Sequence, residues 1–149
     1  MYTKYNAENV LIEVEKKINE LTRKGGTFRI IDVCDELSIF DWWPETIGKS
    51  RLKDMRKFLK EAIKLGFTGY VCFKVGASGC ANGMWAHKES STNGFSPDGP
   101  CLYKSFTPDY NYWDVNFGNG FAEDTFGIIH TIKELEAYIA NHKEGMWYE

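Results

Sequence analysis

The hydrophobic period of the chain changes at Gly66, and this change constrains the fold more than any other feature. The segment "KSRLKDMRKFLKEAIKLG" (49–66) has an amphipathic helical pattern that ends at the glycine. The residues that share its apolar face are Leu52, Met55, Leu59, Ala62 and Ile63. The next segment, "GYVCFKV" (69–75), is a nearly continuous apolar run with β-branched and aromatic residues, which is typical of a central strand. A helix followed by a sheet is therefore expected.

Two further helices are predicted near the two ends of the chain. In "AENVLIEVEKKINELTRKGG" (7–26), apolar residues recur at helical spacing after a capping Asn6 and stop at two glycines. In "HTIKELEAYIANHKEG" (130–145), Thr131 and Glu134 have the spacing of a capping box. A shorter helix is expected within 27–37, where Ile30, Val33, Cys34 and Leu37 share a face, followed by an irregular segment that contains Trp42 and Trp43.

Three more strands are predicted after the central one, at 83–88, 101–106 and 111–117. The turn signals "SPDG", "TPDY" and "GNG" lie between or after them, so consecutive strands are expected to pair as an antiparallel meander of about four strands. In "NYWDVNF" (111–117), alternation places Trp113 on the core side. Tyr112 and Asp114 then point to the opposite side, which we expect to be exposed.

These elements predict a single α+β domain over residues 1–149, with a helical N-terminal half, a small antiparallel meander and a closing C-terminal helix. The order of helices and hairpin in the first 90 residues resembles that of a winged-helix module. The resemblance puts the helix at 49–65 in the recognition position and the hairpin at 70–88 in the place of the wing, and it implies a DNA-binding regulator as an alternative function.

Composition excludes some classes of protein. The longest apolar run is far shorter than the roughly 20 residues that span a bilayer, and the start "MYTKYNAENV" lacks the regions of a signal peptide. We therefore expect a cytoplasmic protein with no membrane partner and with reduced thiols at its four cysteines. Residues 1–75 carry 14 Lys and Arg against 11 Asp and Glu, whereas residues 76–149 carry 4 against 10. This asymmetry argues against a protein that simply coats nucleic acid.

The loop at 76–101, "GASGCANGMWAHKESSTNGFSPDGPC", contains residues that could carry chemistry. His87, Glu89 and the later Pro100 and Cys101 partly match a zinc deaminase signature, but Lys104 stands where its last ligand should be. A zinc site from Cys80, His87 and Cys101 lacks a clear fourth ligand, and a Cys80–His87 nucleophile lacks a clear orienting group. We expect no catalytic residue, no metal and no cofactor, and keep a zinc- or cysteine-dependent enzyme as the second alternative.

The helix at 49–65 carries a basic stripe. It has seven Lys and Arg against Asp54 and Glu61, and the stripe itself consists of Lys53, Arg56, Lys57, Lys60 and Lys64. Such a stripe suits phosphate contacts and makes nucleic acid a possible partner. The same pattern also fits a solvated face or contact with an acidic protein, and the helix has no Asn or Gln to read a base.

Aromatic residues are dense between 85 and 121, a composition found at the cores of protein interfaces. The residues predicted to contact a partner are Trp85, His87, Tyr103, Tyr110, Tyr112 and Asp114. The favoured function is that of a small soluble non-enzymatic binding protein that acts through protein–protein contact, with a host protein as partner. A chain of this kind looks like the inhibitors and accessory proteins of phages and mobile elements, such as anti-CRISPR or other anti-defence proteins.

Overall fold

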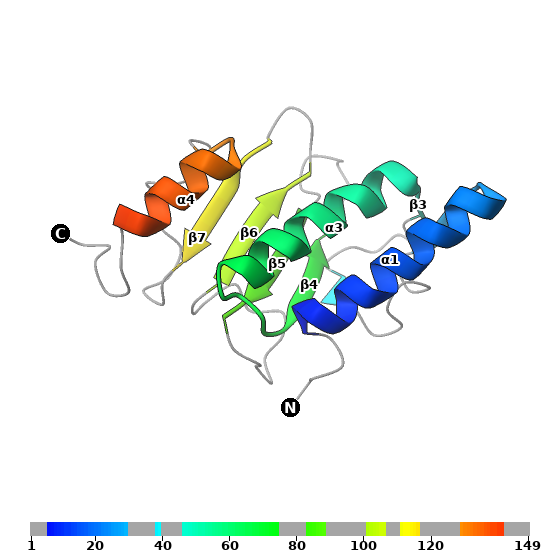
Figure 1. The fold of residues 1–149 in the computed structure, drawn as a ribbon, viewed down its shortest axis with the longest axis horizontal. Coiled ribbons are helices and arrows are strands. Elements are labelled where there is room, and N and C mark those ends of the chain that lie inside the picture. Colours follow the sequence, from blue (N-terminus) through cyan, green and yellow to red (C-terminus); the bar gives the residue numbers. More distant parts are fainter. Residues whose placement is uncertain are drawn as a thin grey trace.

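The computed structural model of the chain describes residues 6–29, 38–39, 46–74, 83–88, 101–106, 111–116 and 129–141 (Figure 1). Its elements in chain order are α1 (Ala7–Lys24), β1 (Phe28–Arg29), β2 (Ser38–Ile39), β3 (Thr46–Ile47), α3 (Lys49–Lys64), β4 (Val71–Lys74), β5 (Gly83–His87), β6 (Cys101–Ser105), β7 (Trp113–Asn116) and α4 (Ile132–Asn141). The predicted α+β class is confirmed, with helices in the N-terminal half and a helix near the C-terminus. The short helix expected within 27–37 falls largely outside the described residues.

The main sheet has the strand order β2-β4-β5-β6-β7. The strands β4 to β7 form the predicted meander, because each pairs antiparallel with the next. The strand β2 adds a parallel edge through Ser38↔Cys72 and Ile39↔Phe73, and β1 and β3 form a separate two-stranded sheet. The β4–β5 hairpin is paired on both sides within the main sheet, so it is not a free wing.

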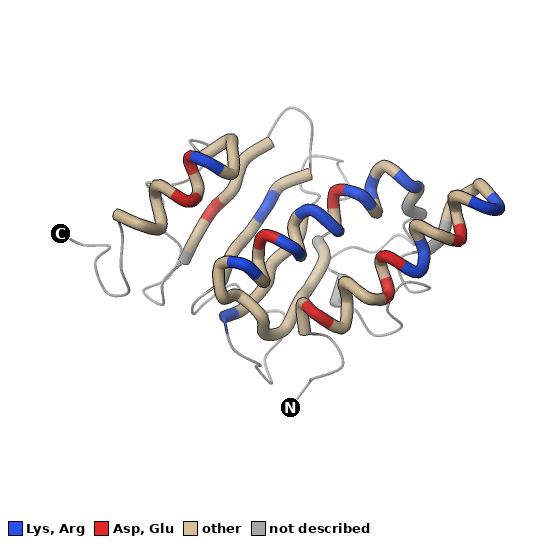
Figure 2. Tube along the Cα trace, in the orientation of Figure 1, with Lys and Arg blue, Asp and Glu red and all other residues tan. Residues whose placement is uncertain are grey.

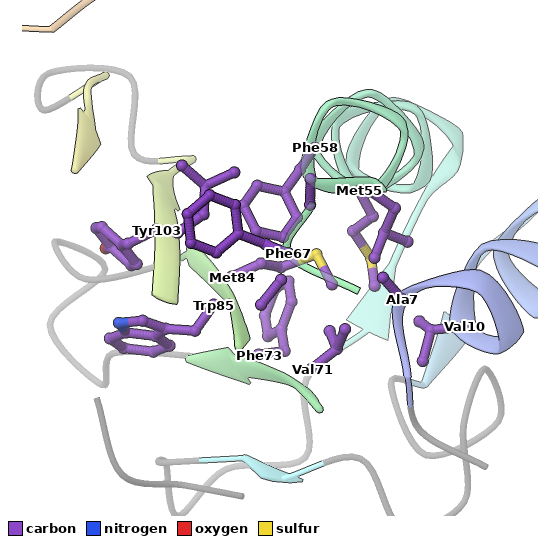
Figure 3. Close-up of a cluster of buried hydrophobic side chains, with 14 of the residues drawn as sticks. Ala7, Val10, Met55, Phe58, Phe67, Val71, Phe73, Met84, Trp85 and Tyr103 are labelled. Carbon is purple, nitrogen blue, oxygen red and sulfur yellow. The ribbon is translucent and has the colours of Figure 1, made fainter. Parts of the chain in front are cut away.

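The helices α1 and α3 pack side by side against one face of the sheet (Figure 1). The core lies between them and the strands, where Met55 and Phe58 of α3 meet Phe73 and Met84 (Figure 3). The helix α4 lies on the side of α3 opposite to α1 (Figure 1). An ion pair joins the two helices, with Lys64 Nζ of α3 2.9 Å from Glu136 Oε2 of α4. No helix in the described part of the chain has both the length and the apolar character needed to cross a membrane.

The ends of the helices follow the local sequence. Asn6 Oδ1 accepts a hydrogen bond from Asn9 N at 2.9 Å at the start of α1. Before α4, Thr131 Oγ1 accepts from Glu134 N at 3.1 Å, so the predicted cap by Thr131 is confirmed. The carboxylate of Glu134 turns back to the Thr131 hydroxyl at 3.1 Å, which is not the contact with the backbone N–H of a full capping box. The N-cap of α3 is Gly48, which has no side chain that could accept a hydrogen bond from the first turn of the helix.

This uncapped start of α3 predicts a stabilising substitution. Gly48 has an extended backbone, with φ −103° and ψ −175°, and a Cβ there would have Thr27 Cγ2 at 3.9 Å as its nearest neighbour. A serine therefore fits and can accept from the first turn of α3. We expect Gly48→Ser to be more stable than Gly48→Ala by about 1 kcal/mol in urea unfolding. Equal stability of the two variants would show that the serine hydroxyl makes no cap.

Candidate ligand pocket

A pocket of about 430 Å³ opens between α3, the strands β6 and β7 and the start of α4. This volume lies within the roughly 300–1,000 Å³ typical of ligand sites. The residues that line it are Asp54, Lys57, Phe58, Lys104, Phe106, Asn111, Trp113, His130, Thr131 and Ile132. They come from four separate segments of the chain, which the sheet and the helices bring together.

Aromatic rings form the apolar part of the pocket. Phe58 of α3 stacks on Trp113 of β7, with ring centroids 5.9 Å apart and planes at 21°. Phe106, just after β6, supplies another ring, and the Arg51 guanidinium lies 5.3 Å from its centroid. Arg51 also donates to the Phe106 carbonyl oxygen at 3.2 Å. The rings are anchored in the core or to α3, so these walls are preformed.

Lys104 is the central polar residue of the pocket. It lies on β6, on the helix side of the sheet, and its Nζ donates to the Ser105 carbonyl oxygen at 2.6 Å and to Asn111 Oδ1. The same nitrogen lies 5.7 Å and 6.0 Å from the ring centroids of Trp113 and Phe106. Among the described residues, no carboxylate lies within ion-pair distance of this nitrogen.

Burial lowers the pKa of Lys104 to about 8, because the ammonium form is poorly solvated between the rings. The carboxylate of Asp54 opposes this shift, whereas the positive charges of Lys57 and Arg51 add to it. Near neutral pH, Lys104 is therefore mostly protonated, and its neutral amine is a minority form.

The segment that leads into α4 completes the pocket. The ring of His130 places Nδ1 2.9 Å from the carbonyl oxygen of Asn111, which ties this segment to the residues before β7. Trp113 N donates to the Ile129 carbonyl oxygen at 2.7 Å and strengthens the same connection. Thr131 caps α4, and both Thr131 and the first helical residue, Ile132, line the pocket.

Those of the predicted partner-contact residues that the structure describes lie on the opposite face of the sheet. The register pairs Trp85 with Tyr103 and Tyr103 with Asp114, and their side chains point away from α3. The ring centroids of Trp85 and Tyr103 are 4.6 Å apart, and those of Tyr103 and Tyr112 are 5.8 Å apart. Figure 3 shows Trp85 and Tyr103 on the side of the sheet away from Phe58.

The alternation in β7 was predicted correctly, but the expected exposure was wrong. Trp113 and Val115 face the core as expected. Tyr112 and Asp114 are only 9% and 4% exposed, and Trp85, His87 and Tyr103 are also buried. A period of two separates the faces of a strand but does not tell whether each is covered. Tyr110 lies outside the described residues, and a role of this set in partner binding stays a prediction.

The basic stripe lies along α3, as predicted (Figure 2). Neighbouring helices neutralise part of it, since Lys60 Nζ is 3.6 Å from Glu15 Oε1 and Lys64 pairs with Glu136. The hydrogen bond to Glu136 raises the pKa of Lys64. Lys57 differs from the rest of the stripe because it is both exposed and part of the pocket.

The candidate metal and cysteine sites are only partly covered by the described residues. His87 and Cys101 are neighbours across β5 and β6, and both are buried, whereas Cys80 lies outside the described residues. Within the described residues, no group of three or more His, Cys, Asp or Glu could hold a metal ion. Burial raises the pKa of Cys72 to about 12, so this thiol stays protonated and is a poor nucleophile.

Sequence reasoning missed the pocket residues Lys104, Asn111 and His130. Lys104 was considered only as a departure from a zinc deaminase signature. A signal was present, however, because in "CLYKSF" (101–106) alternation places Lys104 on the same strand face as Leu102 and Phe106. A lysine between two apolar residues on one strand face is partly desolvated once that face packs against a helix.

Comparisons of the chain with protein-family models, with curated proteins and with solved structures found no match.

Proposed function

We propose that this chain is a non-enzymatic binding protein that acts through protein–protein contact, and that its pocket holds an acidic side chain of the partner. The observation that carries the proposal is the convergence of Lys57 and Lys104 on a concave site with aromatic walls. Asp54 is the one carboxylate among the described lining residues, so the positive charges outnumber it.

The environment of Lys104 favours a carboxylate as the group that enters. Its described hydrogen-bond acceptors, Ser105 O and Asn111 Oδ1, are neutral oxygen atoms. A carboxylate beside Nζ would form a charge-assisted hydrogen bond in a site that is already partly dehydrated, where such bonds are stronger than in water. The aromatic walls of Phe106 and Trp113 would contact the methylene groups of a glutamate side chain.

The surface of α3 extends the positive charge beyond the pocket. Lys53 lies one helical turn before Lys57, about 6 Å away along the helix axis, and both are exposed. An acidic segment anchored in the pocket could therefore continue along α3 and contact both lysines. This arrangement would speed association with an acidic partner, because exposed charges steer encounter.

Duplex DNA fits this surface less well than an acidic protein segment does. Glu15 of α1 and Glu136 of α4 flank α3 and pair with two of its lysines, so a phosphate backbone on the stripe would approach these carboxylates.

Binding of fluorescently labelled peptides tests the proposal. A glutamate-rich peptide is expected to bind, whereas glutamine-rich and lysine-rich peptides of the same length are not. The variants Lys57→Gln and Lys104→Gln should each weaken binding about ten-fold, the scale of one charge-assisted contact. Lys60→Gln is the matched control, because Lys60 is paired with Glu15, and it should change affinity less than about two-fold.

The affinity for the glutamate-rich peptide is expected to fall at high pH. A carboxylate binds the protonated form of Lys104, whose pKa in the free protein is about 8. Affinity should therefore be full below this pH and fall as the pH rises through it. The variant Lys104→Arg keeps its positive charge over this pH range, so its affinity for the peptide should not fall as the pH rises. Duplex binding with a steep salt dependence, together with no binding of the acidic peptide, would instead support a DNA-binding regulator.

A further inference from the structure

Lys104 combines features that are expected of a nucleophilic amine. Its Nζ lies near the rings of Phe106 and Trp113, and its described hydrogen-bond partners are neutral oxygen atoms. A lysine that is paired with a carboxylate is held in its protonated form, but this one has no such partner within ion-pair distance among the described residues. The neutral amine, which carries the reactive lone pair, therefore forms more readily here than on an exposed lysine.

Charges on α3 act on the pKa of Lys104 in both directions, and the largest single effect among them is that of Asp54, which favours the ammonium form. Arg51 and Lys57 of α3 are cationic and disfavour a third positive charge on Lys104, whereas Asp54 of the same helix opposes them. His130, from the segment before α4, lines the pocket as well. The cations that promote the neutral amine would also attract an anionic ligand into the pocket.

We propose that the amine of Lys104 is a nucleophile, and that the pocket takes small aldehydes that carry a carboxylate or phosphate group and holds them as an imine on Lys104. The volume of about 430 Å³ is sufficient for such a molecule. The aromatic walls exclude bulk water from one side of the bond that forms, and Lys57 is the cation that faces the anionic group. This reversible covalent binding does not depend on the proposed protein partner.

The reaction needs no oxidant, reductant or metal. The lone pair of Nζ adds to the aldehyde carbon, and a proton moves from nitrogen to oxygen to give a carbinolamine. The carbinolamine then loses its hydroxyl group from carbon and a hydrogen from nitrogen as water, which leaves the carbon–nitrogen double bond. Hydrolysis reverses these steps and releases the aldehyde unchanged.

Reductive trapping tests the inference on the full chain. The protein is incubated with glyoxylate and cyanoborohydride at about pH 7.5, and the modified lysines are mapped by peptide mass spectrometry over time. Lys104 is expected to be trapped at least about ten-fold faster than the exposed Lys53, because its position between the rings of Phe106 and Trp113 favours the neutral amine. Equal rates at the two lysines would overturn the proposal.

Two variants and a second aldehyde separate the parts of the proposal. Lys104→Arg keeps the positive charge but should abolish the fast addition, and persistence of a fast single addition would place the nucleophile elsewhere. Lys57→Gln should slow the addition of glyoxylate more than that of neutral propanal. Loss of the Lys57 charge makes the neutral amine of Lys104 scarcer for both aldehydes, but only glyoxylate also loses the cation that faces its carboxylate. Equal slowing of both aldehydes, or no slowing of either, would overturn the preference for an anionic aldehyde.

The peptide-binding measurement distinguishes this inference from the proposed function. Lys104→Arg should lose imine formation but still bind the glutamate-rich peptide, since an arginine also pairs with a carboxylate. Trapping at Lys104 without any peptide binding would uphold the inference and overturn the proposed function. Peptide binding without selective trapping at Lys104 would overturn the inference and support the proposed function.

Discussion

Trp113→Ala should lower the free energy of unfolding by about 4 kcal/mol, the usual cost of removing a buried tryptophan. Trp113 is only 2% exposed, and its ring stacks on Phe58 of α3. Its side chain therefore connects the outer strand of the meander to the central helix. Alanine would leave a large cavity at this junction, which neighbouring rings cannot fill without moving. Urea unfolding followed by circular dichroism measures the loss.

Two other substitutions control this result. Trp113→Phe keeps an aromatic ring against Phe58 and should cost much less than the alanine variant. Tyr112→Ala, on the other face of the same segment, should cost about 2 kcal/mol, because Tyr112 is 9% exposed and packs on Tyr103. From the sequence alone, Tyr112 was expected to lie on an exposed face, where its removal would leave the fold cooperative. A stable Tyr112→Ala variant would restore that expectation and contradict the burial of this face.

The helices were predictable because their signals are local. The apolar spacing of α1 and α3 predicted most of the residues that these helices bury, although it missed Phe58 and Glu61 of α3, and Ile63 is only partly buried. The capping residues Asn6 and Thr131 marked the starts of α1 and α4. Each of these signals depends on residues three or four positions apart, which the helix itself brings together. The bounds of α3 followed in the same way from its pattern and from the glycine after it.

The sheet was predictable only where its pairing is between consecutive strands. The strands β4, β5, β6 and β7 pair in chain order, so the meander followed from the order of the strands and from the turn signals between them. The parallel pairing of β2 with β4 joins Ser38–Ile39 to residues more than thirty positions later. A two-residue strand has no period that a sequence pattern could reveal.

The pocket was not predictable because its residues share no local pattern. Lys57, Lys104 and His130 belong to three different segments, and only the packing of α3 and α4 on the sheet brings them to one site. The lowered pKa of Lys104 has the same origin, since it depends on burial and on charges of another element. The exposure of the aromatic face on the other side of the sheet was predicted wrongly for a related reason. Whether a sheet face is covered depends on tertiary packing, which the alternation within one strand does not reveal.

Gly83→Ala is expected to destabilise the fold by about 3 kcal/mol through overpacking. A Cβ on Gly83 would lie 2.6 Å from the Lys104 carbonyl oxygen and 2.7 Å from both Cε1 and Oη of Tyr103. The ring of Tyr103 thus covers the glycine of the neighbouring strand, an arrangement known to compensate for a glycine within a sheet. The carbonyl oxygen belongs to the backbone of β6, so relief would require the two strands to separate.

The equivalent substitution Gly48→Ala is the matched control for Gly83→Ala, because the nearest neighbour of its new Cβ is 3.9 Å away. It should change the free energy of unfolding by less than about 1 kcal/mol. Separation of β5 from β6 in Gly83→Ala should also displace Lys104, whose side chain lines the pocket on the other face of the sheet. We therefore expect Gly83→Ala to slow the trapping of glyoxylate at Lys104 under conditions in which the variant is still folded. If Gly83→Ala is as stable as Gly48→Ala, the Tyr103 ring does not lie over Gly83, and the register between β5 and β6 must differ from the one described.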